Sequence, residues 1–236
     1  MSSRHEEHIV GGGKVRSIIL GLNDGLISTF TLLVGVAAAT LAATGGNSIV
    51  ILTGFAAMVS GAISMGLGEY ISSKSEYNYI KNELKKEKAE LELFPEEEKE
   101  EISDIFKEMG LEGEVLNACV EKVTSNKEVW LNFLAKHELG LGELNKPILG
   151  AILTFFSFVF GSFLPLFAYF FEIAYFSLVL SSVISFFMLF IVGILKTRIT
   201  GDNKVKSGLE MVIIGIVAFI ASYGIGTILE RLISVA

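Results

Sequence analysis

Cysteine and histidine are scarce in this chain, which has one cysteine and three histidines among 236 residues. Cys119 alone cannot form an internal disulfide or a multi-cysteine metal cluster, so we expect it to be a small apolar core residue. His5, His8 and His137 lie outside the long apolar stretches. The sequence also lacks an HExxH segment, a nucleotide-binding glycine loop and a paired nucleophile and base, which argues against an enzyme.

The mean hydropathy of the whole chain is +0.58, and charged residues are nearly absent from five long blocks of it. Each block can cross a bilayer core as a helix, which takes about 20 residues. The blocks are continuously apolar rather than alternating, which disfavours membrane-spanning strands. The sequence therefore predicts an all-α integral membrane protein with five transmembrane helices: residues 15–43, 48–73, 147–170, 173–195 and 207–229. No signal-peptide cleavage site is evident, so we expect the first helix to remain in the mature protein.

The net charge of −7 comes from one insert, residues 74–146, which has 18 acidic and 11 basic residues. Such acidity disfavours nucleic acid as a partner and favours cations. The expected organisation is an N-terminal cytoplasmic tail, transmembrane helices 1 and 2, a cytoplasmic acidic helical domain and transmembrane helices 3 to 5, at residues 1–13, 14–73, 74–146 and 147–236.

Lysine and arginine predict the orientation of the chain, because positive residues mark the cytoplasmic side. They precede the first span, are frequent in the insert and recur between the fourth and fifth spans, at Lys14, Arg16, Lys196, Arg198, Lys204 and Lys206. The other two links have none. We therefore expect the N-terminus and the acidic insert in the cytoplasm and the C-terminus on the opposite side.

The insert is predicted to contain four helices, the first continuing from the second span. Pro95 suits the start of the next helix and Gly110 its end, and the TSN segment at 124–126 suits the cap of a last helix that ends at Gly140. The expected core consists of Ile102, Ile105, Phe106, Met109, Trp130, Phe133 and Leu134.

Glutamates recur at helical spacing in the insert. The first helix carries Glu83, Glu87 and Glu90 on one side, and the second carries Glu98 and Glu101. Like charges this close repel each other unless a cation lies between them. Spacing alone leaves two interpretations open: a solvated charged face interleaved with lysines, or a divalent-cation site to which Glu138 contributes from the last helix.

The first span contains Asp24, ten residues after Lys14 and thus about 15 Å into the membrane at about 1.5 Å per residue. A carboxylate in hydrocarbon costs several kcal/mol and marks a functional site by default. Met65 in the second span lies about 13 Å deep by the same rule, and Glu69 about 7 Å deep on the same face. Carboxylate and thioether together favour Fe²⁺, Mn²⁺, Co²⁺ or Zn²⁺ over Mg²⁺ and Ca²⁺. The alternatives are that Met65 only packs and that Asp24 is a structural cap or a proton relay.

Several motifs resemble those of the vacuolar iron transporter family. They are GLNDGLIST in the first span, GAISMGLGEYISSKSE in the second, FPEEEKEEI and HELGL in the insert, and KPILGAILTFFSFVFGSFLPL in the third span. Their order and spacing agree from about residue 14 to the C-terminus. The resemblance implies a homodimer of five-helix protomers that moves Fe²⁺, and often Mn²⁺, out of the cytoplasm in exchange for protons.

The resemblance also assigns roles to residues. It places the membrane-pathway ligands at Asp24 and Met65, and the cytoplasmic metal-binding glutamates at Glu87, Glu90, Glu98, Glu101 and Glu138. The family often has methionines just before the last of these glutamates, whereas this chain has LAKH at 134–137, so thioether ligation is absent there. A vacuolar membrane is implied for a eukaryotic chain and the cell membrane for a prokaryotic one, which the short loops favour.

Glycines support close packing between membrane helices, including those of two protomers. They lie four apart in the first span (Gly21, Gly25) and seven apart in the second (Gly54, Gly61, Gly68).

We therefore expect the insert to capture metal ions, Glu69 to receive them, and Asp24 with Met65 to bind them until a proton competes for the carboxylate. No resident cofactor is expected, and the partners are divalent metal ions, protons and membrane lipid. The alternatives are a Mn²⁺- or Co²⁺-preferring exporter, a passive cation channel, and a metal-sensing or metal-buffering membrane protein without translocation.

Overall fold

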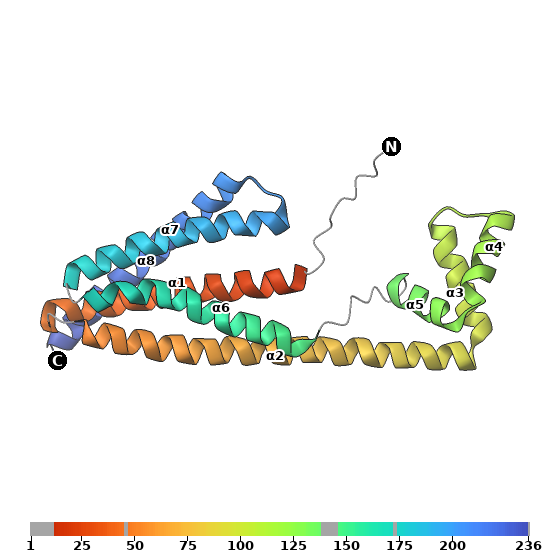
Figure 1. Ribbon diagram of the computed structural model, residues 1–236, viewed down its shortest axis with the longest axis horizontal. Coiled ribbons are helices and arrows are strands. Elements are labelled where there is room, and N and C mark those ends of the chain that lie inside the picture. The colour runs from red at the N-terminus through yellow and green to blue at the C-terminus, as the bar shows by residue number, and fades with distance from the viewer. Residues whose placement is uncertain (1–11, 45–46, 138–145, 172–173, 236) are drawn as a thin grey trace. The chain divides into compact units, whose positions relative to one another are not determined.

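The structure is a computed structural model that describes residues 12–44, 47–137, 146–171 and 174–235. Every regular element in these ranges is helical, which confirms the all-α prediction. In chain order the elements are α1 (Gly12–Thr44), α2 (Ser48–Leu93), α3 (Pro95–Glu108), α4 (Gly113–Thr124), α5 (Lys127–His137), α6 (Pro147–Phe167), the 3₁₀ helix η1 (Ala168–Phe171), α7 (Ala174–Thr200) and α8 (Lys204–Val235) (Figure 1).

Among the described residues, five helical stretches are long and apolar enough to cross a membrane, as predicted: α1, the first part of α2, α6 with η1, α7 and α8. The chain divides into two compact units. The first, here called the helical bundle, comprises Met1–Tyr70 and Ile148–Ala236, and the second, the acidic unit, comprises Ile71–Pro147. Helix α2 is unbroken from Ser48 to Leu93 and contributes to both units.

Helix α1 is at the centre of the helical bundle. It packs against α7 and α8 on one side and against α6 and α2 on the other (Figure 1). The largest core cluster combines apolar side chains of five elements, namely Phe30, Leu33, Val34, Ala37, Val50, Leu166, Tyr169 and Leu178. Helix α8 buries little of its surface, and most of its large apolar residues are exposed, as expected for a helix in contact with lipid.

The predicted glycine positions explain how closely α1 approaches α6. A Cβ atom added to Gly21 would lie 2.5 Å from the carbonyl oxygen of Thr154, and one added to Gly25 would clash with the carbonyl oxygen of Phe158. In α2, Gly54 and Gly61 face side chains of α6, whereas Gly68 has no neighbour within 4 Å. Gly21 and Gly25 therefore serve packing within one chain.

The acidic unit follows the predicted helix pattern at its boundaries. Pro95 occupies the first turn of α3, Gly110 follows that helix with φ +87°, and the Asn126 side chain accepts a hydrogen bond of 2.9 Å from the backbone N–H of Glu128. The buried core of the unit consists of Leu91, Ile102, Leu116, Val120, Trp130 and Leu134, with Ile105, Phe106 and Phe133 packed against it.

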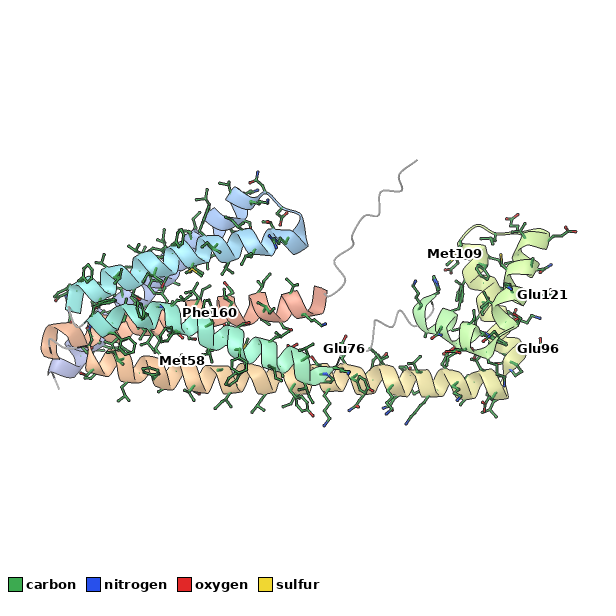
Figure 2. The ribbon with its side chains drawn as sticks, viewed as in Figure 1. Met58, Glu76, Glu96, Met109, Glu121 and Phe160 are labelled. Atoms are coloured by element: carbon green, nitrogen blue, oxygen red, sulfur yellow. The ribbon has the colours of Figure 1, made fainter. Side chains whose placement is uncertain are left out.

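Met109 was expected in this core, and that expectation is wrong. Its side chain is 51% exposed at the end of α3, where Figure 2 labels it. Met109 is the C-cap residue, so its side chain follows the end of the helix and leaves the apolar face. Cys119 is half-buried and makes no disulfide.

Candidate functional site

Contacts among α1, α2 and α6 determine the level of each membrane residue. Helix α1 runs antiparallel to α2, with the Ser17 hydroxyl donating a hydrogen bond to Glu69 Oε1 at 3.2 Å and Leu33 packing near Gly54. This register places Asp24 level with Ala62 and Ile63, and Met65 level with Gly21 and Leu22. The two residues are thus offset by about 4 Å along the helix axes, at 1.5 Å per residue.

The Ser17–Glu69 hydrogen bond also shows which faces of the two helices are turned towards each other. Asp24 is seven residues after Ser17 and shares its side of α1, whereas Met65 is four residues before Glu69 and shares its side of α2. Asp24 and Met65 are both half-buried. Neither side chain is fully exposed or fully enclosed, and no direct contact between them is observed within the described residues.

Asp24 lies at the edge of the packed surface of α1. Leu20 and Ser28, one turn away on either side, are exposed. Within the described part of the chain, no residue forms an ion pair with the Asp24 carboxylate or donates a hydrogen bond to it; the Ser28 hydroxyl bonds to the Asp24 backbone carbonyl instead. A carboxylate at this depth without a protein cation is suited to bind a mobile one.

Glu69 is held between three helices. Besides its hydrogen bond to Ser17, its Oε1 atom would lie 3.0 Å from a Cβ atom added to Gly150 of α6. The absence of a side chain at Gly150 therefore leaves room for the carboxylate. Glu69 is one helical turn from Met65, on the side of the predicted cytoplasmic entrance.

Asn23, Ser28 and Ser64 have neutral oxygens that could also line this path. Asn23 lines a pocket between α1, α7 and α8, to which Leu20, one turn from Asp24, also contributes. Ser64 is exposed on α2.

The acidic unit buries two of the predicted glutamates. Glu87 of α2 is 3% exposed and Glu98 of α3 is 6% exposed, and their carboxyl groups share a hydrogen bond. Burial raises the pKa of Glu98, and the neighbouring carboxylate of Glu101 raises it further. Two buried carboxyl groups in contact must share a proton or bind a cation, since both cannot be ionised without compensation. The solvated-face interpretation is therefore wrong for Glu87 and Glu98.

Other predicted glutamates of this unit are more exposed. Glu90 and Glu101 lie in solvent but close enough to Glu98 to affect its pKa, and Glu83 pairs with Lys86 at 2.6 Å. Within the described residues, no three His, Cys, Asp or Glu side chains form a ready-made metal shell. Glu138 lies outside the described residues.

His137, which precedes Glu138 where the family often has methionines, is exposed. Its ring lies against that of Phe133, with centroids 4.5 Å apart.

Sequence reasoning missed two polar features of the bundle. Ser17 was not singled out, although a hydroxyl at the start of an apolar span is a detectable signal. The second feature is a buried row on α7, where Ser177 contacts Asn47 at 2.9 Å and Ser181 donates to the Pro165 carbonyl at 2.9 Å. These serines, with Ser185, recur every four residues in an apolar helix, and that period could have revealed them.

Comparisons with known proteins show the family of this chain. A sequence profile described as the VIT family matches residues 15–227. The chain is 36% identical to a vacuolar iron transporter of Centaurea cyanus over 226 residues, covering 94% of this chain and 91% of that protein. It is 34% identical to vacuolar iron transporter 1 of Arabidopsis thaliana (96% and 90% covered) and 30% identical to a vacuolar iron transporter of Toxoplasma gondii (93% and 75% covered). With five candidate membrane helices and relatives matched over nearly its whole length, this chain belongs to the VIT family, whose named relatives are metal-ion transporters.

Proposed function

We propose that this protein exports Fe²⁺, and also Mn²⁺, from the cytoplasm in exchange for protons. The observation that carries the proposal is the half-buried, uncompensated Asp24 carboxylate, about 4 Å in level from Met65, with Glu69 one turn further along the same side of α2. This sequence of ligands forms a path along α1 and α2. The names of the relatives support iron as the cargo, and the thioether of Met65 favours a transition ion over Mg²⁺.

In this mechanism Glu69 receives the ion and Asp24 with Met65 binds it at mid-depth. A proton that reaches Asp24 from the opposite side neutralises the carboxylate, which releases the metal. Proton and metal thus exchange by competing for the same oxygens. The positive residues at the start of α1 and at the end of α7 support the cytoplasmic origin of the metal.

Proteoliposomes test this proposal directly. Asp24→Asn keeps the shape of the side chain but removes its charge, so we expect loss of metal-dependent proton flux. Asp202→Asn, at an exposed aspartate between α7 and α8, is the matched control and should transport normally. Fe²⁺, Mn²⁺, Zn²⁺ and Mg²⁺ are compared with and without a proton gradient. Normal flux in the Asp24 variant would remove this residue from the mechanism, and flux that ignores the gradient would indicate a channel.

A second candidate function is metal buffering or sensing, which the buried Glu87–Glu98 pair favours. It predicts that the full chain binds metal but shows no flux. Metal binding by the Asp24→Asn variant, combined with flux in the unchanged protein, would exclude buffering as the whole function.

We also propose that the protein acts as a homodimer. Ala56, Ser60, Ser64 and Gly68 form an exposed row of small residues, four apart, on α2. Small residues gain little from lipid contact but allow two helices to pack closely. A second protomer would also cover the exposed edge beside Asp24.

Cysteine crosslinking tests the dimer, because Cys119 is the only native cysteine. In a Cys119→Ser background, Ser64→Cys should form a crosslinked dimer in membranes. Val217→Cys, on an exposed and bulky part of α8, should not. Equal crosslinking at both positions would indicate random collision.

A further inference from the structure

A pocket of about 350 Å³ lies between α1, α7 and α8, and its lining on α1 ends beside Asp24. This volume is at the lower end of the roughly 300–1,000 Å³ that is usual for ligand sites. It is lined by Arg16, Ile19, Leu20, Asn23, Val192, Lys196, Thr200 and Met211. The lining thus combines two cations and two polar groups with four apolar side chains.

The two cations of this pocket have no acidic partner. Within the described residues, neither Arg16 nor Lys196 forms an ion pair. Asp202, in the link before α8, and Glu210, in α8, line a separate groove. No acidic residue is among those that line the pocket, so its lining carries two positive charges and attracts an anion.

Asn23 supplies an independent sign of a missing ligand. Its Oδ1 atom is buried and has no hydrogen-bond partner within the described residues. An unpaired buried amide oxygen costs free energy, which the side chain would recover by turning towards a hydrogen-bond donor in the pocket. The hydroxyl groups of a lipid headgroup can do so.

The position of the pocket distinguishes a lipid from a soluble anion. Arg16 is near the start of α1 and Lys196 near the end of α7, both at the membrane surface that carries the excess of positive residues. Ile19, Val192 and Met211 extend the lining away from this surface, where acyl chains would lie. Basic pockets between transmembrane helices on this side of a membrane are suited to anionic headgroups.

We propose that this pocket binds an anionic phospholipid, with the phosphate at Arg16 and Lys196, a headgroup hydroxyl at Asn23 and the acyl chains along the apolar lining. The lipid would contact α1 at Leu20 and Asn23, next to Asp24. The proposal does not depend on the transport function.

Native mass spectrometry of the full chain in detergent tests it, with phosphatidylglycerol as the probe and phosphatidylcholine as the neutral comparison. The double variant Arg16→Gln/Lys196→Gln should lower the affinity for the first phosphatidylglycerol by about tenfold or more. Lys14→Gln/Arg198→Gln also removes two positive charges, but at exposed positions outside the pocket, and should change the affinity for phosphatidylglycerol by less than about twofold. Arg16→Lys/Lys196→Arg keeps the charges and should retain binding, which excludes misfolding as the cause.

Three results would overturn the proposal. Equal losses in the two glutamine variants would mean general surface attraction. Equal binding of phosphatidylcholine would show that the cations do not select the headgroup. Displacement of phosphatidylglycerol by millimolar inorganic phosphate would identify a soluble anion as the ligand.

Discussion

Replacing Gly25 by alanine would place a methyl group where the backbones of α1 and α6 touch. The added Cβ would overlap the Phe158 carbonyl oxygen and lie 3.0 Å from the Phe158 Cα atom. Both obstacles are backbone atoms, so no side chain can rotate away. The helices must separate by about 1 Å, and overpacking of this kind costs about 1–3 kcal/mol.

An opposing gain must be separated from this cost, because alanine is favoured over glycine in a helix by about 1 kcal/mol. Gly224→Ala in α8 provides that reference, since its Cβ would meet nothing within 4 Å. The difference in stability between the two variants isolates the cost of the contact, about 1–3 kcal/mol. At this chain length it corresponds to a difference in Tm of about 2–4 °C per kcal/mol.

Thermal unfolding of the purified protein, followed by circular dichroism at the helical band, measures this difference. The Ser162 hydroxyl donates a hydrogen bond of 3.1 Å to the Gly25 carbonyl. Because Gly25 directly follows Asp24, separation of α1 from α6 should also lower metal flux. A Gly25→Ala protein as stable and active as Gly224→Ala would refute the α1–α6 packing described here.

Two further predictions concern the glutamates. The pKa of Glu98 is raised in the folded protein, so the folded state retains a proton that the unfolded chain releases, and metal-free stability falls as pH rises above the usual glutamate range. Glu98→Gln should remove this pH dependence, raise metal-free stability at neutral pH and weaken metal binding. The fluorescence of Trp130, the only tryptophan, monitors all three effects. Glu101→Gln, at an exposed position, should change them less, and unchanged pH dependence in Glu98→Gln would contradict the raised pKa of Glu98. Ser17→Ala removes the hydrogen-bond donor to Glu69 and should raise the apparent KM for metal by up to about tenfold. Ser17→Thr keeps the hydroxyl and should leave the KM unchanged. Equal KM values in the unchanged protein and both variants would show that this hydrogen bond is dispensable.

The helices could be predicted because their signals are local. Continuous apolar blocks define the membrane helices, and Pro95, Gly110 and Asn126 define boundaries in the acidic unit through their own backbone chemistry. The error at Met109 has the same origin: helical periodicity continues through a residue whose side chain belongs to the end of the helix.

The arrangement of the candidate site depended on contacts between helices. Depth counting gave Asp24 and Met65 nearly the same level, at about 15 and 13 Å, whereas the packing register offsets them by about 4 Å. Sequence spacing could not show that Asn23 faces a different pocket, because direction around a helix requires knowledge of its neighbours. Spacing also could not separate the buried Glu87 from the exposed Glu90, since burial depends on where α3 packs.

The outward face of α8 has a consequence for sequence variation. Ile213, Val217, Ile220 and Ile228 are exposed in a helix that buries little. Fluid acyl chains have no fixed shape to match, so any apolar side chain should be tolerated at these positions. A deep mutational scan should therefore find broad aliphatic and aromatic substitution along α8, and near-complete intolerance at Gly21 and Gly25.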